Sequence, residues 1–282
     1  MKRPSFRSLT IAAATAVFTL AGIFTTQAAE PRSNNALFIS HRGENVVAPE
    51  NTMSAFKLAW KLNSDGVETD IHLTKDGKVV CCHDDTTGRT ADQDLTISKS
   101  TLAQLRKLDF GSWKSPKYKG EKIPLLSELL KAAPHDKLVL IEIKSPDMKM
   151  IEPMAKIIKD SNFPLDKIRL ISFHWKSLAK AKKLLPNVEA YALYEFVDKD
   201  AGLNRTPDSI KLLAMLNKTS FDGIDLQNMP QIDKQFVQTF HNAGKSFHVW
   251  TVDAPKEAQR LIGIGVDSIT SNRGAYLKKI LK

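Results

Sequence analysis

Side chains able to do chemistry gather in one part of the chain, at or near the ends of short apolar runs. The stretch from His41 to His83 also holds Arg42, Glu68 and Asp70. A buried core does not require two histidines, two carboxylates and an arginine, because burying such groups costs free energy. Their presence together indicates a functional site. We therefore place the active site in this stretch.

The carboxylates have a spacing that suggests a metal site. Glu68 and Asp70 are two residues apart on one expected strand, so they point the same way, and Glu142 and Lys144 have the same relation on another strand. Three inward carboxylates would repel one another unless neutralised. A hard divalent cation prefers oxygen ligands, so Ca²⁺ or Mg²⁺ fits Glu68, Asp70 and Glu142. The alternative is ion pairing with Arg42 and Lys144 and no metal.

An alternation of short apolar runs and helical patterns must position these side chains. The expected strands span 37–40, 66–73, 79–82, 138–143, 168–173, 190–196, 223–226, 247–252 and 266–270. The expected helices span 52–62, 99–108, 149–161, 175–185, 208–217, 231–243, 255–263 and 274–281. A β/α unit repeated about eight times over roughly 245 residues is typical of a (β/α)₈ TIM barrel of the α/β class. Catalytic residues of such barrels project from the carboxyl ends of the strands, where the candidates fall.

One polar, turn-rich stretch interrupts this rhythm at about residues 85–125. We expect it to be a short insertion after the second β/α repeat, on the functional rim of the barrel. No linker divides the rest of the chain, so residues 29–282 are expected to form a single domain. An open doubly wound sheet is the alternative fold, but no Gly-x-Gly-x-x-Gly pattern follows the first strand.

The amino-terminal segment predicts export. Residues 1–28 start with three basic residues, continue as an uncharged apolar run and end in Thr26-Gln27-Ala28, a spacing that signal peptidases recognise. We interpret them as a signal peptide whose cleavage leaves no stable membrane insertion. An uncleaved anchor is the rival interpretation, because the run is nearly long enough to span a bilayer. The mature protein is then expected to be periplasmic or secreted.

Charge and cysteine content narrow the class of protein. The formal net charge of the 282 residues is +10, and losing the three basic residues of segment 1–28 leaves +7. This mild basicity favours an anionic small molecule or an anionic envelope surface, and no run of Lys and Arg is dense enough to indicate nucleic-acid binding. Cys81 and Cys82 are neighbours in sequence, so we expect buried thiols and no disulfide. Nothing in the sequence indicates an oligomeric state.

A series of short motifs extends over nearly the whole chain beyond residue 40. The motifs are His41-Arg42-Gly43, Pro49 to Thr52, Glu68-Thr69-Asp70, Thr74 to Gly77, His83-Asp84, Arg89-Thr90, Ile123 to Glu128, Glu142-Ile143-Lys144, Ser172-Phe173 and Trp250 to Asp253. In this order they resemble the glycerophosphodiester phosphodiesterase family. The chain departs from the family at its last expected strand, where Thr270-Ser271-Asn272-Arg273 stands in place of a Thr-Asp-x-Pro pattern.

The resemblance implies a barrel enzyme that hydrolyses glycerophosphodiesters to sn-glycerol 3-phosphate and an alcohol. It implies a divalent cation on Glu68, Asp70 and Glu142, general acid–base catalysis by His41 and His83, and phosphate binding by Arg42 and Lys144. The reaction needs one proton removed from the nucleophile and another given to the leaving alkoxide. Which histidine acts as acid and which as base is left open, as is the choice between Ca²⁺ and Mg²⁺.

Three further residues are candidates for the substrate pocket. Trp250 is expected to form a wall, His72 continues the face of Glu68 and Asp70, and Glu50 is expected to orient the first loop. A barrel of the same type acting on lysophospholipids or sugar phosphodiesters is the alternative function. A non-catalytic anion-binding protein is a third interpretation, which the presence of both histidines and all three acids disfavours.

Overall fold

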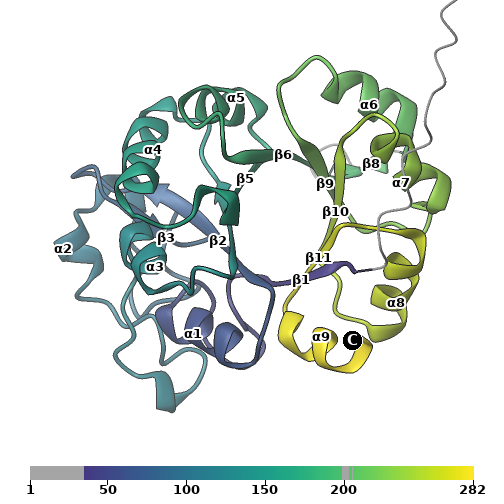
Figure 1. Cartoon of the computed structure of the whole chain (residues 1–282). Helices are drawn as coiled ribbons and strands as arrows, with labels where there is room; N and C mark the ends of the chain where they lie inside the picture. The colour runs from purple at the N-terminus through teal and green to yellow at the C-terminus, as the bar shows by residue number, and fades with distance from the viewer. Residues whose placement is uncertain (1–34, 199–202, 205) are drawn as a thin grey trace, which may run out of the picture.

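Eight parallel strands close into a barrel with helices around it, which confirms the TIM-barrel prediction. The structure is a computed structural model that describes residues 35–198, 203–204 and 206–282, so the expected signal peptide at 1–28 lies outside the described residues. Figure 1 looks down the barrel. The sheet runs in the order β1-β11-β10-β9-β6-β5-β4-β2, and pairing of β1 with β2 closes it.

The strands match the apolar runs to within a few residues at each end. They are β1 Leu37–Ser40, β2 Gly66–Leu73, β3 Val79–Cys81, β4 Leu138–Ile143, β5 Ile168–Ser172, β6 Glu189–Tyr194, β7 Val197–Asp198, β8 Leu203–Asn204, β9 Gly223–Gln227, β10 Ser246–Trp250 and β11 Ser268–Ser271. The short strands β7 and β8 were not expected, and they pair only with each other. Two-residue strands carry too little apolar periodicity to be recognised in a sequence.

Helices follow the barrel strands and cover the outside of the sheet (Figure 1). They are α1 Met53–Lys61, α2 Leu102–Leu105, α3 Leu126–Ala132, α4 Ile151–Asp160, α5 Trp175–Leu184, α6 Ser209–Leu216, α7 Lys234–His241, α8 Pro255–Ile264 and α9 Gly274–Leu281. A large apolar cluster lies between the helices and the strands, and it includes fully buried Phe38, Phe56, Phe240 and Phe247. Burial of these side chains is what holds each strand end, and hence each site residue, in place.

Helix α3 was not expected, and its position explains why. It begins at Leu126, directly after the polar stretch, and it has only seven residues. The Leu125 backbone N–H donates to Glu128 Oε2 (2.9 Å), which satisfies one of the free amide groups at the start of the helix. Leu126, Leu129 and Leu130 are buried against the large cluster, so tertiary packing stabilises a helix too short to be recognised by its periodicity.

Side chains between residues 80 and 125 form a small second core beside the barrel. Strand β3 lies antiparallel to β2, after a tight turn in which Gly77 has a positive φ of 73°. Apolar side chains of this region then pack on one another instead of on the barrel helices: Val80, Cys82, Ile97, Leu105, Leu108, Phe110 and Ile123.

Cys81 and Cys82 are both buried and not bonded to each other, which confirms the prediction of buried thiols. No helix in the described part of the chain is long and apolar enough to cross a membrane.

Candidate active site

The loop between β1 and α1 is held in an unusual backbone conformation. Arg42 has φ of 54°, in the left-handed region, and Gly43 follows with φ of 80°. A Cβ atom on Gly43 would lie 2.6 Å from the backbone carbon of Ala55, at the start of α1, so only glycine fits this contact. The turn directs the backbone N–H of Arg42 to Glu68 Oε2, to which it donates at 2.9 Å. The loop is thereby fixed to the centre of the site.

Glu68, Asp70 and Glu142 come together as their spacing predicted. They lie on the adjacent strands β2 and β4, and Asp70 is directly opposite Glu142 in the register. One carboxylate oxygen of each lies within 4.8 Å of the others, and all three side chains are buried. Within the described chain, Glu68 Oε1 and Asp70 Oδ1 are buried without a hydrogen-bond partner. Orphaned buried carboxylate oxygens in a cluster are suited to bind a hard cation.

The pKa values of the three carboxylates are shifted by their burial and by their charges. Burial, and then the charge of Asp70, raises the pKa of Glu68 well above its ordinary value, and the same two causes raise the pKa of Glu142. Burial also opposes ionisation of Asp70, but Arg42 and Lys144 outweigh it and hold the pKa of Asp70 below its ordinary value. Such a cluster gains stability from any cation that can sit between the carboxylates.

His41 is anchored through its Nδ1 atom. This nitrogen donates to Asn272 Oδ1 at 2.7 Å, and Asn272 is itself held by Asp253, whose Oδ2 accepts from Nδ2 at 2.7 Å. His41 Nε2 lies 3.9 Å from Glu68 Oε2. Burial, followed by the charge of Arg42, lowers the pKa of His41 to about 4. His41 is thus neutral at ordinary pH, and its Nε2 is free of a proton.

His83 is anchored in the same way but by a charged partner. Its Nδ1 donates to Asp84 Oδ1 at 2.6 Å, and its Nε2 accepts from the ammonium of Lys144 at 3.1 Å. Burial, and then the nearby cations Arg42 and Lys144, lowers the pKa of His83, although Asp70 and Asp84 act in the opposite direction. The two histidines therefore differ in the charge of the group behind them.

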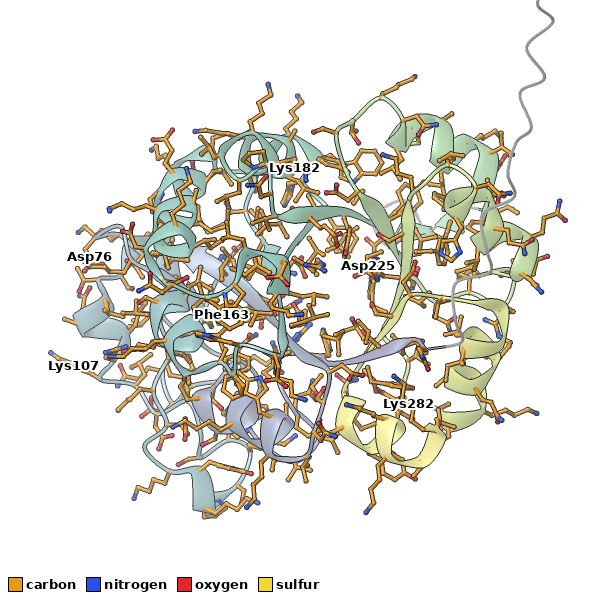
Figure 2. All side chains as sticks on the ribbon, in the orientation of Figure 1. Asp76, Lys107, Phe163, Lys182, Asp225 and Lys282 are labelled. Atoms are coloured by element: carbon orange, nitrogen blue, oxygen red, sulfur yellow. The ribbon has the colours of Figure 1, made fainter. Side chains whose placement is uncertain are left out.

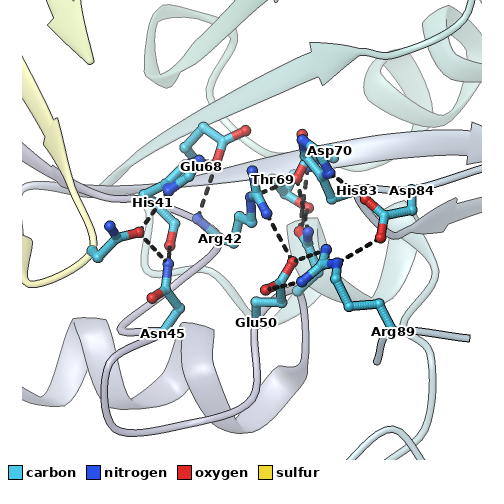
Figure 3. A network of polar contacts seen from close by, with 12 residues as sticks. His41, Arg42, Asn45, Glu50, Glu68, Thr69, Asp70, His83, Asp84 and Arg89 are labelled. Atoms are coloured by element: carbon cyan, nitrogen blue, oxygen red, sulfur yellow. Dashed lines mark hydrogen bonds and ion pairs between the residues drawn. The ribbon is translucent and has the colours of Figure 1, made fainter. Parts of the chain in front are cut away.

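A chain of ion pairs connects the anchors of the site (Figure 3). Arg42 donates from NH1 to Glu50 Oε1 at 2.9 Å, and its Nε lies 3.3 Å from Asp70 Oδ2. Arg89 binds both oxygens of Glu50 at 2.8 Å and donates to Asp84 at 2.6 Å. Figure 3 shows Arg42 between His41 and His83, with Glu50 and Arg89 on one side of the group. The network fixes the orientation of Arg42 and, through Asp84, of His83.

Most of the residues singled out from the sequence surround one cavity of about 350 Å³. The lining includes His41, Arg42, His83, Lys144 and Trp250, together with Glu68 and Glu142. Asp70 is fully buried beneath this surface. The structure does not bring Glu50 or His72 to the cavity wall. Glu50 supports Arg42 and Arg89, whereas the His72 ring contacts the backbone oxygen of His83 (3.1 Å) and lies near Asp85.

Two sets of residues contribute to the site although the sequence analysis assigned them no role there. Asp225 on β9 lines the cavity, and Figure 2 shows it at the inner wall of the barrel. It is 1% exposed, its Oδ1 has no hydrogen-bond partner among the described residues, and burial followed by the charge of Glu142 raises its pKa to about 8. The other set is Asn272 with Asp253, which anchors His41. Asn272 belongs to the segment in which the chain departs from the family motif, and this departure was the one feature of the sequence that pointed to it.

A larger cavity of about 570 Å³ lies at the opposite end of the barrel. Its wall includes the first residues of four strands: Leu37, Leu138, Ser246 and Ser268. His248 is at this end, stacked on Tyr191 with ring centres 4.1 Å apart. His248 therefore does not belong to the active-site cavity, although it lies only two residues before Trp250.

Comparison with known proteins agrees with this geometry. The model of the glycerophosphoryl diester phosphodiesterase family matches residues 41–275. The chain belongs to this family. A glycerophosphodiester phosphodiesterase of Caldanaerobacter subterraneus subsp. tengcongensis is 34% identical over 242 residues, which cover 84% of this chain and 93% of that protein. One of Bacillus subtilis is 28% identical over 87% of this chain and 86% of that protein.

A solved structure of the same kind shows the same fold. A phosphodiesterase of Oleispira antarctica, determined in complex with the product sn-glycerol-3-phosphate, superimposes with a TM-score of 0.77. It is 27% identical, and the match covers 87% of this chain and 96% of that one. The family membership makes this chain an enzyme of the glycerophosphodiester phosphodiesterase class.

Proposed function

We propose that this protein hydrolyses glycerophosphodiesters to sn-glycerol 3-phosphate and an alcohol, with a divalent cation and with His41 and His83 as the acid–base pair. The observation that supports this most strongly is the arrangement around one cavity. Two histidines, each with Nδ1 tied to a neighbouring side chain, lie beside three clustered carboxylates and two cationic side chains. These are the groups that cleavage of a phosphodiester requires.

The metal proposal depends on the donor set. Glu68, Asp70 and Glu142 would hold the ion, and their oxygens are the ligands that both Ca²⁺ and Mg²⁺ prefer. When bound, the cation supplies charge neutralisation and polarisation of the phosphate oxygens. Glu68 Oε1 and Asp70 Oδ1 are buried and accept no hydrogen bond from the described residues, which favours a bound cation over ion pairing alone. Membership of the family also supports a bound metal ion. Titration with each ion distinguishes Ca²⁺ from Mg²⁺.

Arg42 and Lys144 supply fixed positive charge for the phosphate. The pKa of each is raised by nearby carboxylates despite burial, so both stay charged at ordinary pH. Arg42 cannot move far, because Glu50 and Asp70 hold its guanidinium. A fixed guanidinium can bind two oxygens of one phosphate. These cations stabilise the charge that develops on the phosphate oxygens during cleavage.

We assign the base role to His41 and the acid role to His83. The partner of His41 is the neutral amide of Asn272, whose hydrogen bond raises the pKa of the ring by less than burial and Arg42 lower it. The partner of His83 is the carboxylate of Asp84, which favours a protonated ring. His41 Nε2 then accepts the proton of the nucleophile, and His83 Nε2 gives a proton to the leaving alkoxide. The polarity of the two partners is what distinguishes the roles.

The test is turnover of glycerophosphocholine by the purified mature protein, with and without EDTA. We expect hydrolysis that EDTA abolishes and that Ca²⁺ or Mg²⁺ restores. His41→Ala and His83→Ala should each lower kcat by about 10²- to 10⁴-fold. His135→Ala is the matched control, because His135 is exposed and its ring meets that of Phe163 edge to face, away from the active site. Full activity in EDTA would overturn the metal proposal, and hydrolysis only of lysophosphatidylcholine or a sugar phosphodiester would overturn the substrate proposal.

We further propose that the enzyme acts outside the cytoplasm, in a periplasm or after secretion. The support is the basic, apolar and small-residue pattern of residues 1–28. Expression of the full chain in a bacterial host, followed by fractionation and mass spectrometry, should give a protein that begins at Ala29. A protein that retains Met1 in the membrane fraction would instead support the uncleaved anchor.

A further inference from the structure

The active-site cavity continues away from the carboxylates into an aromatic groove. This groove, of about 260 Å³, shares Phe173, Leu193 and Glu195 with the cavity and extends to Trp175 and Met215. Phe173 directly follows β5, and Glu195 directly follows β6. Both therefore lie at the same rim of the barrel as Lys144, which follows β4. The groove provides room for the part of a substrate that extends beyond its phosphate.

Aromatic rings in fixed positions line this continuation. Phe173 and Trp250 meet edge to face, with ring centres 5.6 Å apart. The indole N–H of Trp250 donates to the backbone oxygen of Asp225 at 3.2 Å, and that of Trp175 donates to the backbone oxygen of Leu193 at 3.1 Å. Rings held in this way can attract a cation at little cost in side-chain entropy, because their faces carry negative charge density.

The charges along the cavity are divided between its two ends. Among the residues described at its wall, the only Lys and Arg side chains are Arg42 and Lys144, and both contact the clustered carboxylates. The groove end has no Lys or Arg among its described lining residues, but it has Glu195. Within the described part of the chain, no ion pair involves Glu195, which is half-buried at the junction of cavity and groove.

We propose, on the basis of the proposed function, that the enzyme prefers glycerophosphodiesters whose alcohol carries an ammonium group. Glu195, Phe173 and Trp250 receive this group, while Arg42, Lys144 and the cation site hold the phosphate. A zwitterionic substrate such as glycerophosphocholine matches both ends of the cavity. A trimethylammonium group has no hydrogen to donate, so it is bound by ring faces and by the nearby carboxylate charge.

The experiment compares kcat/KM for glycerophosphocholine with kcat/KM for glycerophosphoglycerol, whose second alcohol is uncharged. We expect the wild-type ratio to favour choline. Glu195→Gln should lower this ratio about three- to tenfold, and Phe173→Leu about two- to fivefold, because each removes one attraction for the ammonium. Phe173 is 37% exposed, so its replacement leaves the core intact. Glu152→Gln, on the outside of the barrel in α4, is the matched control and should leave the ratio unchanged.

The outcomes separate this inference from the function on which it depends. If neither diester is hydrolysed, the proposed function fails. If both are hydrolysed with equal kcat/KM, or if Glu195→Gln keeps the wild-type ratio, the function stands and the ammonium preference is overturned. A fall in kcat/KM for both substrates by the same factor would also overturn it, because that result assigns Glu195 a general structural role.

Discussion

Lys144 Nζ lies 3.1 Å from His83 Nε2, so a cation from the end of β4 contacts the histidine that follows β3. The same ammonium lies 3.0 Å from Glu142 Oε1 and 3.7 Å from Asp70 Oδ1. Lys144 thus connects the proposed acid to the proposed metal ligands. Its charge helps to lower the pKa of His83 and helps to keep Asp70 ionised.

Removing this charge should raise the pKa of His83. Lys144 is one of the groups that lower it, so Lys144→Met in metal-free protein should move the His83 titration to higher pH. NMR titration of the histidine ring signals measures the change. Lys137→Met is the control, since Lys137 is paired with exposed Asp136 away from the active site, and its loss should leave the His83 titration unchanged. An unchanged His83 titration in Lys144→Met would show that the contact has no electrostatic role.

Removing the carboxylate behind His83 should have the opposite effect. The hydrogen bond from His83 to Asp84 raises the pKa of the ring, so Asp84→Asn should lower it. The acid role requires protonated His83, and the alkaline limb of the kcat/KM profile should therefore shift to lower pH. Asp136→Asn, an exposed carboxylate on another loop, should keep the wild-type profile. A shift of the acidic limb alone would instead assign the base role to His83.

Asn51 should be needed for tight metal binding. Its Nδ2 donates to Asp70 Oδ2 at 2.8 Å, and its Oδ1 accepts from Thr69 at 2.8 Å. Because φ is 54° at this position, Asn51→Gly removes the side chain without backbone strain. We expect metal affinity to fall about 10- to 100-fold, as for other residues that orient metal ligands. Calorimetric titration with Ca²⁺ or Mg²⁺ measures the affinity.

Asn63→Gly is the matched control for that experiment. Asn63 also has a positive φ, 65°, but it follows α1, and its side-chain oxygen accepts from half-buried Lys137 and not from a group of the active site. It should bind metal with wild-type affinity. Equal affinities of the two variants would mean that Asp70 needs no support from Asn51.

Gly43→Ala should destabilise the protein more than Gly77→Ala. Both glycines have similar positive φ values, 80° and 73°. A Cβ on Gly43 would meet Ala55 at 2.6 Å, whereas one on Gly77 would have no atom within 4 Å. The contact should add about 1–3 kcal/mol to the loss of unfolding free energy, measured in urea. Equal losses for the two variants would mean that α1 can move away from the loop.

The two thiols should be unreactive in the folded protein. Cys81 and Cys82 are 2% and 4% exposed, and burial raises the pKa of each to about 12. At pH 8 both are therefore neutral in the native state, and the thiolate that attacks a disulfide reagent is absent. Ellman's reagent should detect no thiol before unfolding in guanidinium and two afterwards. Reaction of one thiol in the native state would show that the packing around that cysteine opens.

The sequence by itself determined the architecture and most of the candidate site. Strands such as Leu138–Ile143 are nearly continuous in apolar residues because they are buried on both faces, and this pattern is local. The spacing of Glu68 and Asp70 determined their common direction, because side chains alternate along a strand. Helix α3 was missed because seven residues give little periodicity, and its stability comes from packing.

Only the tertiary structure decided which residues support the catalytic groups. Asn272 lies 231 positions from His41 in the chain, and it becomes its partner because β11 pairs with β1 when the barrel closes. Asp225 and Glu195 carry no motif, and they enter the cavity through the positions of β9 and β6 in the sheet. His248 shares a strand with Trp250 but lies at the other cavity, because strand length separates the two ends of a barrel. These contacts form only when the sheet closes into a barrel, and closure depends on the whole chain and not on any local pattern.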